Sequence, residues 1–200
     1  MQRFLKATAM AVVLAAAGAS AQATNVSFAG TLAGDNDVKL FSFTLAADAD
    51  VTLRTWSYAG GTNAAGSAIG AGGFDPLVSL FFGSGDTAIL FDANDDGTGV
   101  ATDPVSGNAY DSLLVGSLLA GTYTVALSQF DNFAIGGTLG DGFMGYSGAP
   151  GFGGRSNAWA LDILGVDAAA AVAEPPTLAL ALAAFGLVVV GSRVRTRVPA

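Results

Sequence analysis

The chain has 200 residues, of which 28 are glycine and none is cysteine or histidine, and this composition excludes thiol nucleophiles, histidine general bases and imidazole zinc sites. All fifteen aspartates lie between residues 24 and 173, where only Lys39, Arg54 and Arg155 are basic, so this body has a formal charge of −12. Binding to nucleic acid needs clustered lysine and arginine and is excluded as well, whereas divalent cations suit such an acidic surface.

The N-terminal segment has the features of a secretory signal peptide. Arg3 and Lys6 precede an apolar run at residues 7–17, and small residues follow it. Ala21 and Ala23 occupy the two positions that a signal peptidase reads, so we expect cleavage after Ala23, with the Ala19-Ser20-Ala21 site as the second choice. A buried N-terminal helix is the alternative, but the segment has no polar face. The sequence therefore predicts export, with residues 1–23 removed.

The body, residues 24–172, is expected to be one all-β domain. Period-two alternation of apolar residues, interrupted by turn residues, predicts eight short strands at residues 25–32, 38–45, 51–58, 76–82, 87–92, 111–118, 122–130 and 157–164. No helical period occurs between them. This pattern predicts an antiparallel β-sandwich, jelly-roll-like, flanked by the signal-peptide helix and by a C-terminal transmembrane helix.

Two glycine-rich stretches, residues 60–75 and 136–157, interrupt the strands. Neither continues into the Gly-Lys-Ser/Thr of a phosphate-binding loop, and neither has the strict nonapeptide period of a calcium repeat. They are expected to be surface loops, long enough to mark a surface that meets a partner. Their aromatic residues are then expected to make contacts: Phe74, Phe143, Tyr146 and Phe152. The aromatic residues inside strands are expected in the core: Phe41, Phe43, Trp56, Phe81, Phe91, Tyr123 and Trp159.

A candidate calcium loop, "DANDDGTGVATD", directly follows the strand predicted at residues 87–92. Its spacing matches the start of a calcium-loop pattern, in which alternating oxygen ligands converge and a glycine at position 6 permits the bend. The candidate ligands are Asp92, Asn94 and Asp96 at positions 1, 3 and 5, the Thr98 carbonyl, and Asp103 at position 12. Position 12 carries Asp where Glu is usual, and no helix follows. The alternative is a solvated turn between two strands.

The body resembles bacterial pre-peptidase C-terminal-like domains, which are small calcium-associated β-sandwiches. The resemblance rests on "GDNDVKLFSFTL", "DVTLRT", "FDPLVSLF", "ILFDANDDG" and "LLAGTYTVALSQFDN", in that order, and covers roughly residues 35–132. Such domains occur beside secreted peptidases and in stand-alone surface proteins. No peptidase domain accompanies this one, so the resemblance implies a fold and a calcium association but no activity.

The last 28 residues contain a second apolar segment, within "AEPPTLALALAAFGLVVVGSRVRTR". Residues 177–192 would span about 24 Å as a helix, less than the roughly 30 Å hydrocarbon core, so we expect a transient membrane segment rather than a robust anchor. Arg193, Arg195 and Arg197 would hold the C-terminus in the cytoplasm. Pro175 and Pro176 would keep the preceding peptide extended. A permanent anchor is the alternative, and a core helix would not need the arginines.

This tail is similar to the PEP-CTERM sorting signal, with its motif at residues 173–176, apolar segment at 177–192 and basic cluster at 193–197. Glu174 and Pro175 match the motif, and Ala173 stands where the family has its first proline. The resemblance implies recognition by exosortase, a membrane-embedded cysteine protease-transpeptidase of Gram-negative bacteria that make exopolysaccharide.

Together these features predict a non-enzymatic exported protein of the cell surface or extracellular matrix, processed by signal peptidase and an exosortase-type system. Exopolysaccharide, a biofilm or other surface proteins would be its partners, after transient anchoring in the inner membrane. The alternative is a calcium-dependent carbohydrate- or protein-binding module that keeps its transmembrane helix. A hydrolase is a third hypothesis, but only a pair of carboxylates could serve it.

Overall fold

The computed structural model describes residues 24–172. The predictions for the two ends lie outside these residues. They concern the signal peptide with Ala21 and Ala23, the sorting motif at Ala173, Glu174 and Pro175, the apolar segment, and the basic cluster at Arg193, Arg195 and Arg197. Among the described residues there is no helix of the length and apolarity needed to cross a membrane.

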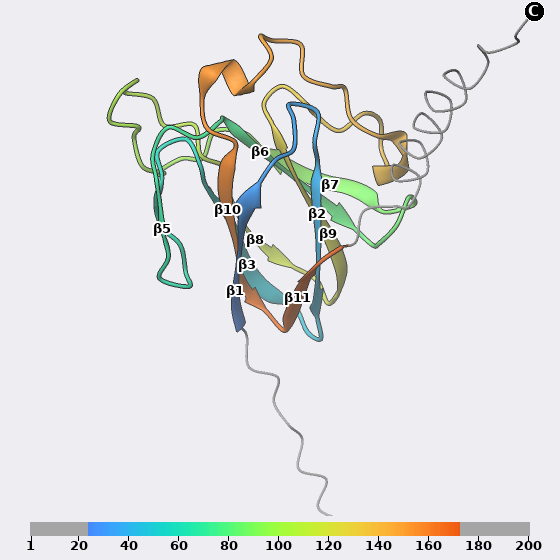
Figure 1. Cartoon of the computed structure of the whole chain (residues 1–200). Helices are drawn as coiled ribbons and strands as arrows, with labels where there is room; N and C mark the ends of the chain where they lie inside the picture. Colours follow the sequence, from blue (N-terminus) through green and yellow to red (C-terminus); the bar gives the residue numbers. More distant parts are fainter. Residues whose placement is uncertain (1–23, 173–200) are drawn as a thin grey trace, which may run out of the picture.

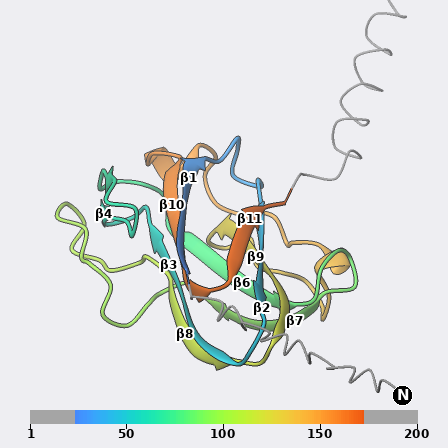
Figure 2. The same cartoon turned by 90° about the horizontal axis from the view of Figure 1, so that it is seen from below.

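The described chain is all-β, and its strands pair antiparallel in two main sheets that face each other (Figures 1 and 2). The first sheet has the order β1 (Thr24–Thr31), β10 (Ala158–Val166), β3 (Ala49–Trp56) and β8 (Leu113–Leu118). The second has the order β11 (Ala168–Ala171), β2 (Lys39–Leu45), β9 (Gly121–Gln129), β6 (Pro76–Phe82) and β7 (Ile89–Asn94). A short hairpin pairs β4 (Gly61–Thr62) with β5 (Ala68–Ile69).

All eight predicted strands are present, with ends within two residues of the prediction. Three strands were not predicted. The two-residue strands β4 and β5 lie in the first glycine-rich stretch, where Gly61 lets the chain lie against the Trp56 ring. A Cβ at Gly61 would stand 2.5 Å from that ring. Strand β11 consists of four alanines and has no alternation that could reveal it.

The core lies between the two sheets and follows the period-two pattern of the strands. In β2, Phe41, Phe43 and Leu45 are buried and alternate with half-buried or exposed residues. Phe43 stacks on Tyr123 of β9, with ring centroids 5.1 Å apart and an interplanar angle of 11°. Leu53 of β3 belongs to the same cluster, so residues of both sheets form one core.

The aromatic residues of the glycine-rich stretches are largely inside, which corrects the expectation that they make contacts. Phe74 is 1% exposed in the main core, and Phe152 packs beside it with ring centroids 5.6 Å apart. Phe143 packs in a second cluster, around Phe81 and Ala126, on the other face of the five-stranded sheet. The second glycine-rich stretch therefore covers parts of both clusters. It contains two short 3₁₀ turns, η1 (Leu139–Asp141) and η2 (Phe152–Gly154). Tyr146 is partly exposed.

Replacing a core ring gives the first test of this packing. Phe43→Ala should lower the free energy of unfolding by about 3–5 kcal/mol, because it removes a fully buried ring and leaves a cavity between the sheets. Phe91→Ala is the matched control: its ring is 57% exposed, so the loss should be under about 1 kcal/mol. Urea denaturation of both variants measures the difference, and equal losses would contradict the described core.

Candidate functional site

The start of β6, the end of β7 and the start of β8 meet at one end of the molecule. The Ser112 hydroxyl lies within hydrogen-bonding distance of the carbonyls of Pro76, at 2.6 Å, and Asn94, at 2.8 Å, so it connects all three strands. The Gly97 N–H donates to the Asp111 carbonyl at 2.9 Å. The candidate calcium loop therefore starts at a fixed point, beside the segment that enters β8.

The predicted calcium ligands have the following contacts. Asp92 is exposed on β7 and accepts from the N–H of Ala93. The Asn94 side chain accepts from the Leu113 N–H at 2.8 Å and donates to the Asp96 carbonyl at 3.3 Å. Asp96 and Thr98 are exposed.

Asp103, the predicted ligand at position 12, is buried and turned toward other partners. Its Oδ2 accepts from the N–H and hydroxyl of Ser106 and lies 3.5 Å from the Arg155 guanidinium. The hydrogen bonds from Ser106 lower the pKa of Asp103. Within residues 24–172, no group of three or more acidic side chains is arranged to hold a metal ion. The calcium loop stays a prediction.

A different carboxylate at this end is under electrostatic stress. Burial, followed by the charges of Asp96, Asp95 and Asp111, raises the pKa of Asp75 to about 8. Arg155 acts in the opposite direction. The Oδ1 atom of Asp75 is buried and has no hydrogen-bond partner within the described part of the chain. Asp75 is thus a proton-binding group in the pH range where proteins usually work.

Two further buried aspartates have structural roles: Asp111, just before β8, and Asp162, inside β10. Asp111, 2% exposed, accepts from the N–H groups of Ser57 at 2.7 Å and Ala59 at 2.9 Å. Asp162, also 2% exposed, accepts from the Trp56 indole at 2.7 Å and the Ala64 N–H at 3.0 Å. The bond of Asp162 to Ala64 attaches the first glycine-rich stretch to the four-stranded sheet, and the bonds of Asp111 hold the residues that lead into that stretch. Carboxylates saturated by such donors are structural.

A candidate surface is a groove between the two sheets, where β7 and β8 are edge strands. We call it the edge groove. Its volume is about 380 Å³, and it is lined by Phe82, Ile89, Leu90, Phe91, Ser117, Leu119 and Tyr123. Four of these side chains are strongly exposed: Phe82 at 46%, Ile89 at 59%, Phe91 at 57% and Leu119 at 69%. Contiguous exposed apolar side chains mark contact surfaces, so the edge groove is the leading candidate binding site.

Sequence reasoning missed the edge groove because of a local irregularity in β7. Leu80 pairs with Asp92 and Phe81 pairs with Leu90, so Phe91 is an extra residue in the pairing of β6 with β7. Such a bulge turns a side chain out of the alternation. The expectation that Phe91 lies in the core is wrong for this reason. The bulge itself has no sequence signal here.

Comparison with known proteins adds no family assignment. No family model matches the chain, and no curated protein is significantly similar to it.

The titration of Asp75 generates a testable pH dependence. Because its folded pKa is about 8 and its ordinary value is 3.8, the folded state holds a proton that the unfolded state has lost between these pH values. The free energy of unfolding should therefore fall as pH rises through this window. Asp75→Asn should flatten that fall, and urea midpoints measured across the window would show it.

Asp141→Asn is the control for this experiment. Hydrogen bonds from Thr138 lower the pKa of Asp141, so its contribution is present above about pH 4 and is lost only at lower pH. This variant should leave the slope between pH 4 and 8 unchanged. An equal slope in Asp75→Asn and wild type would refute the assignment to Asp75.

Proposed function

We propose that this chain is a non-enzymatic exported protein of the cell surface or extracellular matrix, built on a jelly-roll β-sandwich. The topology supports the jelly roll. The orders β1-β10-β3-β8 and β2-β9-β6-β7 arise when the chain passes repeatedly between two sheets, with β11 added beside β2. The fold does not decide the function, so the binding role rests on the surface of the molecule.

The edge groove is the observation that carries the binding role. On a body with a charge of −12, four large apolar side chains remain exposed at one place. Exposing them costs solubility, which a contact with a matrix polymer or another surface protein would offset. Its rings present flat apolar faces on which sugar rings or apolar side chains can lie.

The route to the surface is proposed from the two ends of the chain. Signal peptidase would cleave after Ala23, and the protein would remain in the inner membrane of a Gram-negative cell by residues 177–192. An exosortase would then act at the motif around Glu174 and Pro175, and the body would pass to the exopolysaccharide. The resemblance to PEP-CTERM proteins supports this order of events. The resemblance to pre-peptidase C-terminal-like domains supports a surface module.

A hydrolase is less well supported than a binding protein. A glycosidase-type acid with a raised pKa, as Asp75 has, would need a second free carboxylate that faces the same substrate. Asp111 and Asp162 are occupied by backbone N–H groups and the Trp56 indole.

The test of the proposed function is retention of the protein in the matrix of an exopolysaccharide-producing Gram-negative host. The double substitution Phe91→Ser with Leu119→Ser should lower the matrix-bound fraction about tenfold, which corresponds to a loss of about 1.4 kcal/mol at a contact surface. Both side chains are exposed, so the fold should tolerate the change. Quantitative immunoblots of washed matrix and medium measure the fraction.

The matched control changes two exposed apolar residues outside the edge groove. Val105→Ser with Met144→Ser alters side chains that are 91% and 67% exposed and should leave retention unchanged. The same preparations provide the intact mass of the protein, which should lack residues 177–200. An intact peptide containing Arg193, Arg195 and Arg197 on the cell surface would instead establish the permanent anchor.

The second candidate function is a calcium-dependent carbohydrate- or protein-binding module, and the repulsion around Asp75 favours it. A cation near Asp75, Asp95 and Asp96 would relieve the charge interactions that raise the pKa of Asp75. Asp96 belongs to the predicted calcium loop, and its own pKa is raised by partial desolvation of its otherwise exposed carboxylate and by the charge of Asp95. Calcium would therefore neutralise the charges that act on Asp75.

This alternative predicts a calcium-dependent melting temperature. A site with a dissociation constant on the order of 10⁻⁴ M would suffice outside the cell, and a hundredfold excess of ligand stabilises by about 2.7 kcal/mol. Millimolar calcium should raise the melting temperature by several degrees, and magnesium should raise it less. Asp96→Ala should abolish the difference. An equal response of Asp96→Ala and wild type would mean that the ions only screen the charge.

A further inference from the structure

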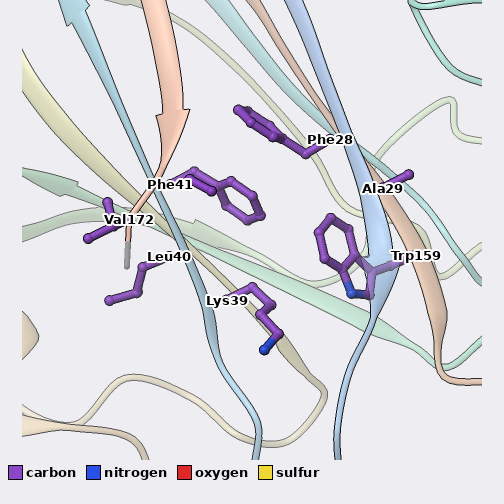
Figure 3. A pocket seen from close by; sticks show the side chains of 8 residues that line it. Phe28, Ala29, Lys39, Leu40, Phe41, Trp159 and Val172 are labelled. Carbon is purple, nitrogen blue, oxygen red and sulfur yellow. The ribbon is translucent and has the colours of Figure 1, made fainter. Parts of the chain in front are cut away.

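A pocket lies on the side of the molecule opposite the edge groove, where β1 and β11 are the edge strands. We call it the indole pocket. Its volume is about 380 Å³, and its walls include Phe28 of β1, Lys39 and Phe41 of β2, Trp159 of β10, and Val172 just after β11 (Figure 3). A space of this size can hold a single sugar ring or a similarly small ligand.

The indole of Trp159 brings a hydrogen-bond donor without a partner to the wall of the pocket. The side chain is only 6% exposed, and its Nε1 atom is buried with no hydrogen-bond partner within residues 24–172. Gly30 faces this ring across β1 and β10, and a Cβ there would stand 3.1 Å from it, so the ring is held close to β1. A buried donor without an acceptor is unfavourable, because its hydrogen bond to water has been lost and not replaced.

A second polar group lies at the same end of the pocket. Figure 3 shows the indole nitrogen of Trp159 and the amino group of Lys39 on one side, away from Phe28. The Lys39 ammonium pairs with the Asp37 carboxylate at 3.0 Å, and this carboxylate also accepts from the Ala33 N–H at 2.7 Å. The polar end thus holds the indole donor of Trp159 beside the paired charges of Lys39 and Asp37.

The opposite end of the pocket is aromatic. The ring of Phe28 is partly exposed and lies 4.7 Å from the Phe41 ring, at an interplanar angle of 38°. Phe41 in turn contacts Trp159 edge to face, with ring centroids 5.6 Å apart. A ligand with one apolar face would pack on Phe28 and reach the polar end with its other side.

We propose that the indole pocket binds a single pyranose ring, the terminal or branching sugar of a polysaccharide. A sugar hydroxyl oxygen would accept from the Trp159 N–H, a neighbouring hydroxyl would bond to the Lys39–Asp37 pair, and the C–H face would pack on Phe28. A free carboxylate fits less well, because the Asp37 carboxylate stands beside Lys39 and repels it. A hydrocarbon would leave the indole donor unpaired. This proposal rests on the proposed association with exopolysaccharide and names a subsite for it.

The test is titration of the full-length protein with methyl glycosides, in a detergent that carries no sugar headgroup. The chain contains two tryptophans, so Trp56→Phe leaves Trp159 as the only indole fluorophore. The methyl glycosides of glucose, galactose, mannose and N-acetylglucosamine are the probes. At least one of them should change the Trp159 emission with saturation on the order of 1 mM, the affinity expected of a single small ring.

Two variants test whether the glycoside binds in the indole pocket. Their affinity for the glycoside is measured by calorimetry or saturation-transfer NMR, which do not need the Trp159 fluorophore. Trp159→Phe keeps an aromatic wall but removes the N–H, and it should weaken binding at least tenfold. Asp37→Asn at the rim removes the charged acceptor with little risk to the fold and should weaken it several-fold. Val105→Ser, in a distant exposed loop, should bind as wild type does.

Three results would overturn the proposal: no response to any glycoside, undiminished binding by Trp159→Phe and Asp37→Asn, or saturation by phenylacetate alone. These outcomes are separable from failure of the proposed function. If the protein is retained in the matrix through the edge groove but binds no glycoside, only the proposed sugar subsite is refuted. Glycoside binding by a protein that is never retained would refute the matrix role.

Discussion

The packing of the four-stranded sheet on the five-stranded sheet is the interaction on which the other features depend. Phe43, Leu53 and Leu161 lie in one cluster with residues of both layers, and each is at most 1% exposed. A two-layer core of this kind is covered by its own sheets but ends at their edge strands. The edge groove lies where β7 and β8 end the sheets, and the indole pocket lies where β1 and β11 do. Both candidate binding sites are therefore products of the layer architecture.

The negative charge imposes the second constraint, and the fold meets it with backbone N–H groups. Asp111 and Asp162 are nearly inaccessible to solvent, and the body contains only three basic residues that could form ion pairs with its aspartates. They accept from backbone N–H groups instead: Asp162 holds the first glycine-rich stretch at Ala64, and Asp111 holds the residues just before that stretch. Arg155 complements them, because it donates to the carbonyls of Gly73 and Tyr58. Burial and the neighbouring carboxylates raise the pKa of Asp75 to about 8, and no donor at its Oδ1 atom offsets them.

The strands were predictable because each carries its own alternation, and every strand longer than four residues was found. The failures have local causes. The four alanines of β11 carry no pattern, and β4 with β5 depends on a close approach at Gly61. The bulge at Phe91 turns a ring outward that alternation places inside. Phe74 and Phe143 were expected at the surface because they lie in glycine-rich loops, yet loops that cover a sheet bury their rings.

The candidate sites were less predictable than the strands, because each depends on groups far apart in the sequence. The spacing of the acidic loop gives no sign that Asp103 turns to Ser106 and Arg155. The residues of the indole pocket come from four strands, and the unpaired state of the Trp159 N–H is a property of the packed structure alone. A sequence can therefore indicate which residues are acidic or aromatic, but not which polar atoms packing leaves without a partner.

The two edge sites differ in what they can contribute to recognition. Apolar contact in the edge groove gains affinity in proportion to the area covered and distinguishes poorly between partners of similar shape. A buried donor that must find an acceptor discriminates more sharply, because a ligand without one leaves the donor unpaired. In a matrix protein the edge groove would therefore supply most of the attachment. The indole pocket, with Trp159 and the Lys39–Asp37 pair, would decide which polymer is retained.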